Sequence, residues 1–307
     1  MKPFFQTLVK TVKLSINNRY FLLFSNGFLL ALLLMCYLQA DYESQLFKSL
    51  AQYVQGRMVT NPDSKEGLLI ESLHVTHELG KNRKILFGTK AIDNPQAQLL
   101  KPLTYDLMTG QQACGGFSYV LARLLQEMKI ETRFAQMQVN KIYGGHIVLE
   151  AKMPYGWVVV DPLFDLYFTM PDKRIASFAE VRSNWNEFKN MVPKDYDASY
   201  AYEDVRYTNW EKIPVILPAI KNIMLWSRGK EATESFSFRN LFLKKYEVLF
   251  YGLLVIYLAI FFLTIRSFFN YVRELASRDA NLLFPKTSEN AQKNQVTCQR
   301  VTFPSNL

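Results

Sequence analysis

The chain contains few cysteines and few histidines. Among its 307 residues there are three of each. Three cysteines in unrelated settings form no disulfide framework, so Cys114, which lies outside the apolar run of Cys36 and the polar tail of Cys298, is expected to be a free thiol. The sequence also lacks internal repeats, a P-loop, a dinucleotide-binding glycine pattern and zinc-finger spacing. It therefore predicts neither a cofactor nor a metal site.

Charged residues are missing from two long segments, 20–38 and 248–265. Each is close to the roughly 20 apolar residues that cross a bilayer as a helix. Residues 1–19 contain four basic residues and no acidic one, which predicts a cytoplasmic N-terminus and export of the segment that follows. Two crossings then return the C-terminus to the cytoplasm. A cleaved secretory signal and a buried core helix are the alternatives for the first segment.

The net charge of +9 raises the question of a nucleic-acid partner. The basic residues are scattered or flank the apolar runs, and no aromatic residues alternate with them in a recognisable nucleic-acid motif. Anionic lipid is the partner that this distribution favours. We therefore expect the lipid bilayer, and not nucleic acid, to bind this charge.

The segment from Thr109 to Phe168 contains the most informative residues. Apolar residues recur at helical spacing after Cys114, so a helix is predicted to begin at this cysteine. Unpaired N–H groups and the positive end of the helix dipole would favour a thiolate there. Strands are expected at 132–139, 146–150 and 157–160.

Antiparallel pairing of the second and third predicted strands would place His146 beside Asp161 and near the cysteine helix. A thiol nucleophile, Cys114, would then have His146 as its base and Asp161 as the group that orients the imidazole. Asp165 is an alternative orienting carboxylate. Three structural residues that never meet, or a domain that has lost its activity, remain alternatives.

Three sequence segments resemble the transglutaminase-like superfamily of papain-type folds: GQQACGGFSYVLARLLQEMKIETR, GGHIVLE and WVVVDP. The order Cys, His, Asp and its spacing match, and the resemblance covers about a fifth of the chain. It implies that Cys114 is the nucleophile, His146 the base and Asp161 the orienter. By the same resemblance, Gln111 or Gln112 is a possible donor to an oxyanion.

The chain departs from this family at two places. Many members have an aromatic residue after the cysteine, where this chain has Gly115-Gly116. They often have Ala-Trp after the histidine, where this chain has Ile147-Val148. These differences leave the choice of substrate open.

Three further segments allow two interpretations each. His74 and His77 are spaced to share a helix face and bind a metal, but no third ligand is near them in sequence, so an ordinary helix surface is expected. The tyrosine-rich segment 193–210 is either a substrate-facing loop or a packed edge of the domain. The apolar segment 213–226 is predicted to form a kinked helix on the membrane or on the domain.

We expect an α+β protein in which a papain-like, transglutaminase-like core, with the cysteine helix packed on an antiparallel sheet, is flanked by two transmembrane helices. The predicted organisation is a cytoplasmic N-terminus (1–19), a transmembrane helix (20–38), a helical part of the extracytoplasmic domain (39–95), the catalytic core with a C-terminal helical part (96–227), a linker (228–245), a second transmembrane helix (246–265) and a cytoplasmic tail (266–307).

The function predicted from these features is that of a membrane-anchored thiol enzyme. It would hydrolyse an amide, or transfer its acyl group, in a peptide, protein or glycopeptide substrate through a thioester. The alternative is a catalytically silent membrane scaffold that uses the same fold to bind a protein or a glycan.

Overall fold

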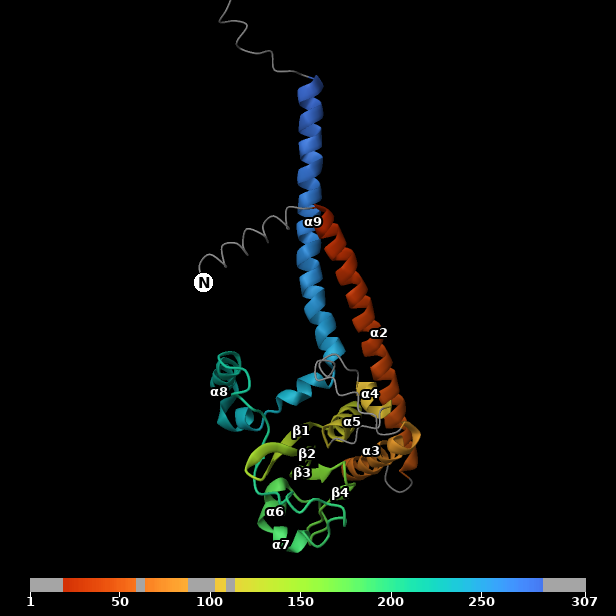
Figure 1. Ribbon diagram of the computed structural model, residues 1–307, viewed down its shortest axis with the longest axis vertical. Coiled ribbons are helices and arrows are strands. Elements are labelled where there is room, and N and C mark those ends of the chain that lie inside the picture. The colour runs from red at the N-terminus through yellow and green to blue at the C-terminus, as the bar shows by residue number, and fades with distance from the viewer. Residues whose placement is uncertain (1–18, 59–63, 88–102, 109–113, 284–307) are drawn as a thin grey trace, which may run out of the picture. The chain divides into compact units, whose positions relative to one another are not determined.

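The structure of the chain is a computed structural model that describes residues 19–58, 64–87, 103–108 and 114–283 (Figure 1). It divides into two compact units. One consists of the residues up to Leu34 and from Tyr251 onward, and the other of Met35–Phe250. The second unit contains the sheet and the residues predicted to form the site.

Two long helices are apolar enough to cross a membrane. They are α2 (Arg19–Arg57) and α9 (Lys245–Leu283), and the apolar segments predicted as spans lie inside them. Within the first unit, Asn26 Nδ2 donates to Thr264 Oγ1 at 2.6 Å, so one polar contact joins the two helices. Side chains of this kind hydrogen-bond between helices in membranes. The side of the membrane on which each terminus lies stays a prediction.

The second unit is built on an antiparallel sheet of five strands. The strands are β1 (Thr132–Val139), β2 (Ile142–Met153), β3 (Gly156–Asp161), β4 (Leu166–Tyr167) and β5 (Val205–Arg206), in the order β4-β3-β2-β1-β5. The α+β class is therefore confirmed. The bounds of β1 match the alternating segment that predicted it, and β3 begins one residue before the predicted segment and includes Asp161.

Helices and loops cover both faces of this sheet (Figure 1). On one face, α3 (Lys65–Phe87) and α5 (Cys114–Glu127) pack against it through an apolar cluster that includes Leu73, Leu121 and Leu149. The short helix α4 (Leu103–Met108) packs beside α5. On the other face, Val148 and Val159 pack against the segments that follow β4.

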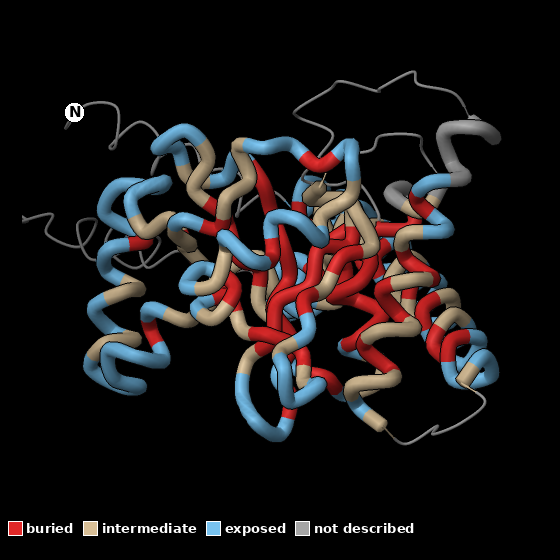
Figure 2. The backbone as a smooth tube through the Cα atoms, turned by 90° about the horizontal axis from the view of Figure 1, so that it is seen from below, coloured by how far each residue is buried: buried red, intermediate tan, exposed pale blue. Residues whose placement is uncertain are grey.

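Burial follows from this layering, because a strand covered on both faces has no solvent-facing side. Strand β2 is buried at every position from His146 to Ala151. Figure 2 shows the buried residues gathered along the strands and the helices that pack on them, with exposed loops around. A polar side chain on this part of β2 must therefore find a partner inside the protein.

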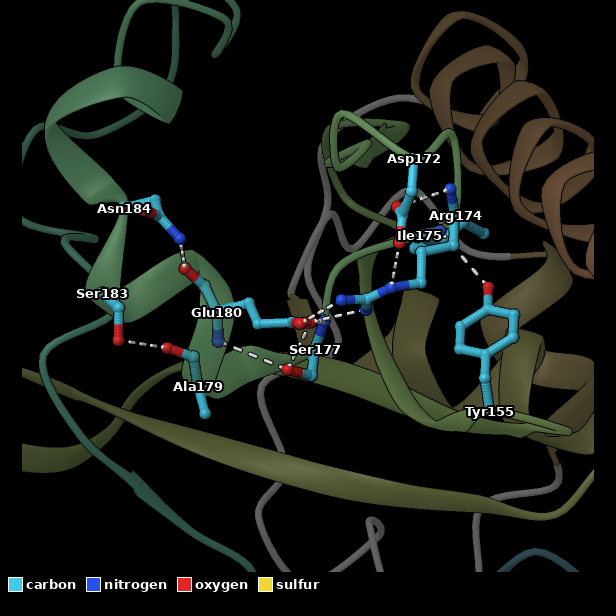
Figure 3. Close-up of polar contacts among 9 residues, drawn as sticks. All are labelled: Tyr155, Asp172, Arg174, Ile175, Ser177, Ala179, Glu180, Ser183 and Asn184. Carbon is cyan, nitrogen blue, oxygen red and sulfur yellow. Dashed lines mark hydrogen bonds and ion pairs between the residues drawn. The ribbon is translucent and has the colours of Figure 1, made fainter.

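The helical spacing of Phe178, Val181, Trp185 and Phe188 predicts a helix that begins at Ser177, with the serine as its N-cap. The structure divides this helix into α6 (Phe178–Ser183) and α7 (Trp185–Phe188). The serine N-cap is confirmed. Ser177 Oγ accepts a hydrogen bond from the N–H of Glu180 at 3.3 Å, and the Glu180 carboxylate accepts one from the N–H of Ser177 at 2.9 Å (Figure 3). The break between the helices lies at Asn184.

Arg174 links the start of α6 to the preceding turn. Its guanidinium binds the Glu180 carboxylate, with one contact of 2.9 Å, and the Asp172 carboxylate at 2.8 Å (Figure 3). The hydrogen bond from Arg174 lowers the pKa of Glu180 to about 2. The capping residue is therefore held ionised, which is the form that best accepts hydrogen bonds at a helix start.

The segment predicted as a linker, 228–245, packs on the domain. It contains the end of α8 (Ile216–Glu234) and the short helix η2 (Phe238–Phe242). Ser237 Oγ accepts from the N–H of Phe134, and Asn240 Nδ2 donates to the carbonyl oxygen of Thr132 at 2.6 Å. Polar side chains of the segment that was predicted as a linker thus form hydrogen bonds with the backbone of β1.

Candidate active site

A β-bulge at Gly144 and Gly145 determines how His146 enters the site. In the pairing of β1 with β2, Met137 faces His146 while the next residue, Gln138, faces Tyr143, so the two glycines have no partners across the ladder. Strand β2 therefore begins before the glycine pair, and the prediction that it begins at His146 was wrong. Bulges bend a strand and redirect the side chains beside them.

Only glycine fits these two positions comfortably. Gly144 has φ of +91°, a conformation that L side chains rarely adopt. A Cβ atom on Gly145 would lie 2.6 Å from Cβ of Val139, closer than carbon atoms approach one another. The close approach of β1 and β2 at this point therefore requires the absence of a side chain just before His146.

His146 and Asp161 form a buried hydrogen-bonded pair. Nε2 of His146 lies 2.6 Å from Oδ2 of Asp161, and both side chains are completely buried. The antiparallel register, in which Leu149 faces Val160, carries Asp161 toward His146 at the end of β3. The other carboxylate oxygen accepts a hydrogen bond from the N–H of Leu163 at 3.1 Å, which fixes the carboxylate.

Cys114 is the first residue of α5, and its half-buried thiol interacts with His146. Burial raises the pKa of this thiol, but the imidazole of His146, by hydrogen bonding and by charge, and the backbone of Ile147 outweigh that effect. The charge of Asp161 opposes them weakly, and the net result is a lowered pKa. The side chain is thus biased toward the thiolate, the nucleophilic form of cysteine.

The pKa of His146 moves in the direction that complements the thiol. Burial lowers it, but hydrogen bonds to Asp161 and Cys114, together with their charges, raise it to about 9. Because Nε2 faces Asp161, Nδ1 is the ring nitrogen left for the thiol; it is buried and has no hydrogen-bond partner, the sulfur included, in the described part of the chain. A thiolate and an imidazolium stabilise each other in this arrangement.

Tyr200 covers the ring of His146. The two rings stack with centroids 4.2 Å apart and planes inclined by 9°. Phe164 contacts the same imidazole with centroids 6.1 Å apart, and Tyr196 packs on Phe164 at 4.7 Å. An aromatic face over an imidazolium stabilises the positive charge and keeps water from the ring.

The tyrosine-rich segment therefore matches both of its interpretations in part. Tyr196 and Tyr202 are buried in the apolar cluster on the sheet, as expected of a packed edge. Tyr200 instead belongs to the candidate site, and nothing in the sequence indicates which tyrosine would do so. The clustering of tyrosines among carboxylates was the only signal, and it has no periodicity that singles out one residue.

Asp165 lies away from His146 and binds His74. Nδ1 of His74 is 2.7 and 2.8 Å from the two oxygens of Asp165, and this contact raises the pKa of His74. His77 packs against the ring of Phe117 at 6.3 Å. In the described ranges, no group of three or more histidine, cysteine, aspartate or glutamate side chains is placed to hold a metal ion.

The space beside Gly115, the residue after Cys114, is open. A Cβ atom on Gly115 would meet only Cδ1 of Ile147, at an ordinary contact distance of 3.8 Å. The N–H groups in the first turn of a helix have no partners within that helix and are suited to bind an anion. Gln111 and Gln112, the predicted oxyanion donors, and the preceding Gly110 lie outside the described residues.

Comparison with known proteins adds no assignment. No family model matches the chain, and neither the curated proteins nor the solved structures include a match. The candidate site is therefore defined by the geometry and electrostatics of its own residues.

Proposed function

We propose that this protein is a membrane-anchored thiol enzyme that cleaves or transfers the acyl group of an amide in a peptide, protein or glycopeptide. Cys114 is the nucleophile, His146 the proton carrier and Asp161 the residue that orients the imidazole. The observation that supports this most strongly is a half-buried thiol whose pKa is lowered by the imidazole of a buried, hydrogen-bonded His146–Asp161 pair.

The reaction begins with attack by the Cys114 thiolate on the amide carbonyl carbon. A C–S bond forms, and the π electrons of the carbonyl move to oxygen, where first-turn N–H groups of α5 stabilise the negative charge. Loss of one such donor lowers the rate on the order of 10²-fold in comparable sites. The oxyanion then collapses, the C–N bond breaks, and the imidazolium of His146 gives its proton to the departing amine.

The second half of the reaction releases the acyl group. Water, an amine or a hydroxyl attacks the thioester, and neutral His146 takes the proton of the attacking group. The C–S bond breaks, and the Cys114 thiolate is restored beside the imidazolium. Asp161 holds the ring throughout through its hydrogen bond to Nε2, so Nδ1 stays directed at the reacting atoms.

A relationship to transglutaminase-like, papain-type folds is part of this proposal. It is supported by the order of the elements: a helix beginning at the cysteine, then an antiparallel sheet whose neighbouring strands β2 and β3 carry the histidine and the aspartate. In the proposed topology, α2 and α9 both cross the bilayer, the domain lies outside the cytoplasm, and both termini lie inside.

An acyl-capture experiment tests the chemistry. The purified full chain is incubated with a library of peptide and glycopeptide amides, quenched in acid, and weighed intact by mass spectrometry. A mass increase located on Cys114, absent in Cys114→Ala, is expected. In Asp161→Asn the yield of this adduct is expected to fall, because the imidazole is no longer held by a carboxylate.

A chain that forms no adduct with any amide and releases no amine would contradict the enzyme assignment. The same chain, if it bound a glycan or protein without covalent change, would instead be the silent scaffold. The matched control Cys36→Ser, which alters a buried cysteine outside the site, should leave the adduct unchanged.

A further inference from the structure

Helix α8 presents an apolar stripe to solvent. Ile216, Ala219, Ile223 and Trp226 are spaced by three or four residues, so they follow one another along a single side of the helix. All four are exposed, and the fraction reaches 63% for Ile223 and 89% for Trp226. Val215, just before the helix, is 81% exposed and extends the stripe.

This stripe differs from the isolated apolar residues found on any protein surface. Large apolar side chains aligned along one exposed helix face are typical of a surface that binds another protein or a membrane. Another side of the same helix faces the domain, where Leu217 is buried. The stripe is thus an unpartnered face of a helix that is attached to the domain through its other residues.

The chain itself indicates what covers the stripe. Only the segment 235–244 separates α8 from α9, which is long and apolar enough to cross a membrane. At ~3.3–3.6 Å for each extended residue, that segment spans at most about 35 Å. Once α9 is inserted, α8 is confined near the surface of the bilayer.

The composition of α8 also fits a membrane surface. Tryptophan and isoleucine on one side of a helix, with lysine and arginine on its polar side, is the pattern of helices that lie in the lipid interface. Arg228 and Lys230, both exposed, lie at the end of the helix on either side of the kink at Gly229. Their charge complements anionic headgroups.

We propose that α8 is an interfacial helix whose stripe Ile216–Ala219–Ile223–Trp226 inserts into the surface of the lipid bilayer. The domain is then held to the membrane at a third place, besides α2 and α9. This contact would fix the orientation of the domain on the bilayer, and with it the direction from which a substrate reaches the sheet. It is independent of the thiol chemistry proposed above.

The four tryptophans of the chain make the proposal measurable, because none of them lies in α2 or α9. Full-length protein is reconstituted into nanodiscs of phosphatidylcholine and phosphatidylglycerol with or without bromine on the acyl chains. Bromine quenches tryptophan only at short range, so quenching reports side chains outside the spans that enter the lipid. We expect clear quenching in the wild type and loss of more than half of it in Trp226→Phe.

Two further variants make the result specific. Trp185→Phe is the matched control, because Trp185 packs against Phe168 and Tyr202 inside the domain, and it should retain the quenching. Ile223→Asp places a charge in the stripe at an exposed position, so the fold is retained, and Trp226 should leave the lipid.

An unquenched wild type would overturn the proposal, whether the stripe stays in water or a second copy of the chain covers it. Quenching that survives both Trp226→Phe and Ile223→Asp would overturn it as well, since another tryptophan would then be the one in contact with lipid. Either outcome leaves the acyl-capture experiment unaffected.

Discussion

Replacing Gly145 by alanine tests how the strand positions His146. The added methyl carbon would lie 2.6 Å from Cβ of Val139 and 3.0 and 3.4 Å from its two methyl carbons. Carbon atoms in contact are separated by about 3.5–4.0 Å. Strands β1 and β2 must therefore move apart by about 1 Å, next to the residue that binds Asp161.

The expected cost follows from overpacking at a site with no free space. We expect Gly145→Ala to lower the free energy of unfolding by about 1–3 kcal/mol. The reaction of the Cys114 thiol with iodoacetamide at neutral pH should slow as well, because a displaced imidazole stabilises the thiolate less. Denaturant unfolding and the labelling rate are measured on the same preparations.

A second substitution distinguishes the clash from other effects of alanine. Val139→Gly removes the carbon nearest to the new methyl group, and its own cost, from the lost packing of Val139 and the added backbone freedom, is measured in the single variant. The double variant should be more stable than the sum of the single effects by about 1–3 kcal/mol, and its labelling rate should recover. Unchanged stability and labelling in Gly145→Ala would refute the bulge as the device that positions His146.

Three other variants test separate parts of the structure. Gly80→Ala would place Cβ 1.9 Å from the ring of Phe117, so denaturant unfolding should show a loss of about 2 kcal/mol or more, despite the better helix propensity of alanine. Asp165→Asn removes the partner that raises the pKa of His74; the stability that this contact adds should be present below pH 6.5 and disappear as the pH rises through the raised pKa, which pH-dependent unfolding of the two proteins measures. Tyr200→Leu should move the pH midpoint of thiol labelling upward and slow labelling at neutral pH about two- to five-fold, whereas Tyr200→Phe, which keeps the stacked ring, should not.

The elements with strong periodicity were predictable from sequence. Strand β1 was found with its correct bounds, because apolar and polar residues alternate through Thr132–Val139. The start of α5 at Cys114 was found because apolar residues recur at helical spacing behind it. The two apolar helices were identified from long segments without charge, which need no tertiary information.

The errors arose where packing decides the local structure. Gly144-Gly145 suggested the end of one segment, but the two residues form a bulge within β2, because β1 continues to pair on both sides of them. The helix after Ser177 is interrupted at Asn184, although its apolar spacing runs on. The segment 228–245 resembles a linker in sequence because polar and basic residues predominate in it. Two of its polar side chains, Ser237 and Asn240, instead bind the backbone of β1.

The candidate site was predictable in part. The meeting of His146 with Asp161 follows from antiparallel pairing of two short strands, since the register brings the end of β3 beside the start of the buried part of β2. The stack of Tyr200 on His146 depends on a loop that folds back over the sheet from a distant part of the sequence. No local pattern encodes that contact, so sequence reasoning missed it.

The pH dependence of Cys114 alkylation tests the central claim most directly. The full chain is treated with iodoacetamide from pH 5 to 10, and modification of the peptide that contains Cys114 is followed by mass spectrometry. The lowered pKa predicts a labelling midpoint below the ~8.5 of a free cysteine. His146→Ala should raise the midpoint to that value or above, and His74→Ala, the matched control outside the site, should leave it in place. A wild-type midpoint at or above the free-cysteine value, or one that His146→Ala does not move, would contradict the account.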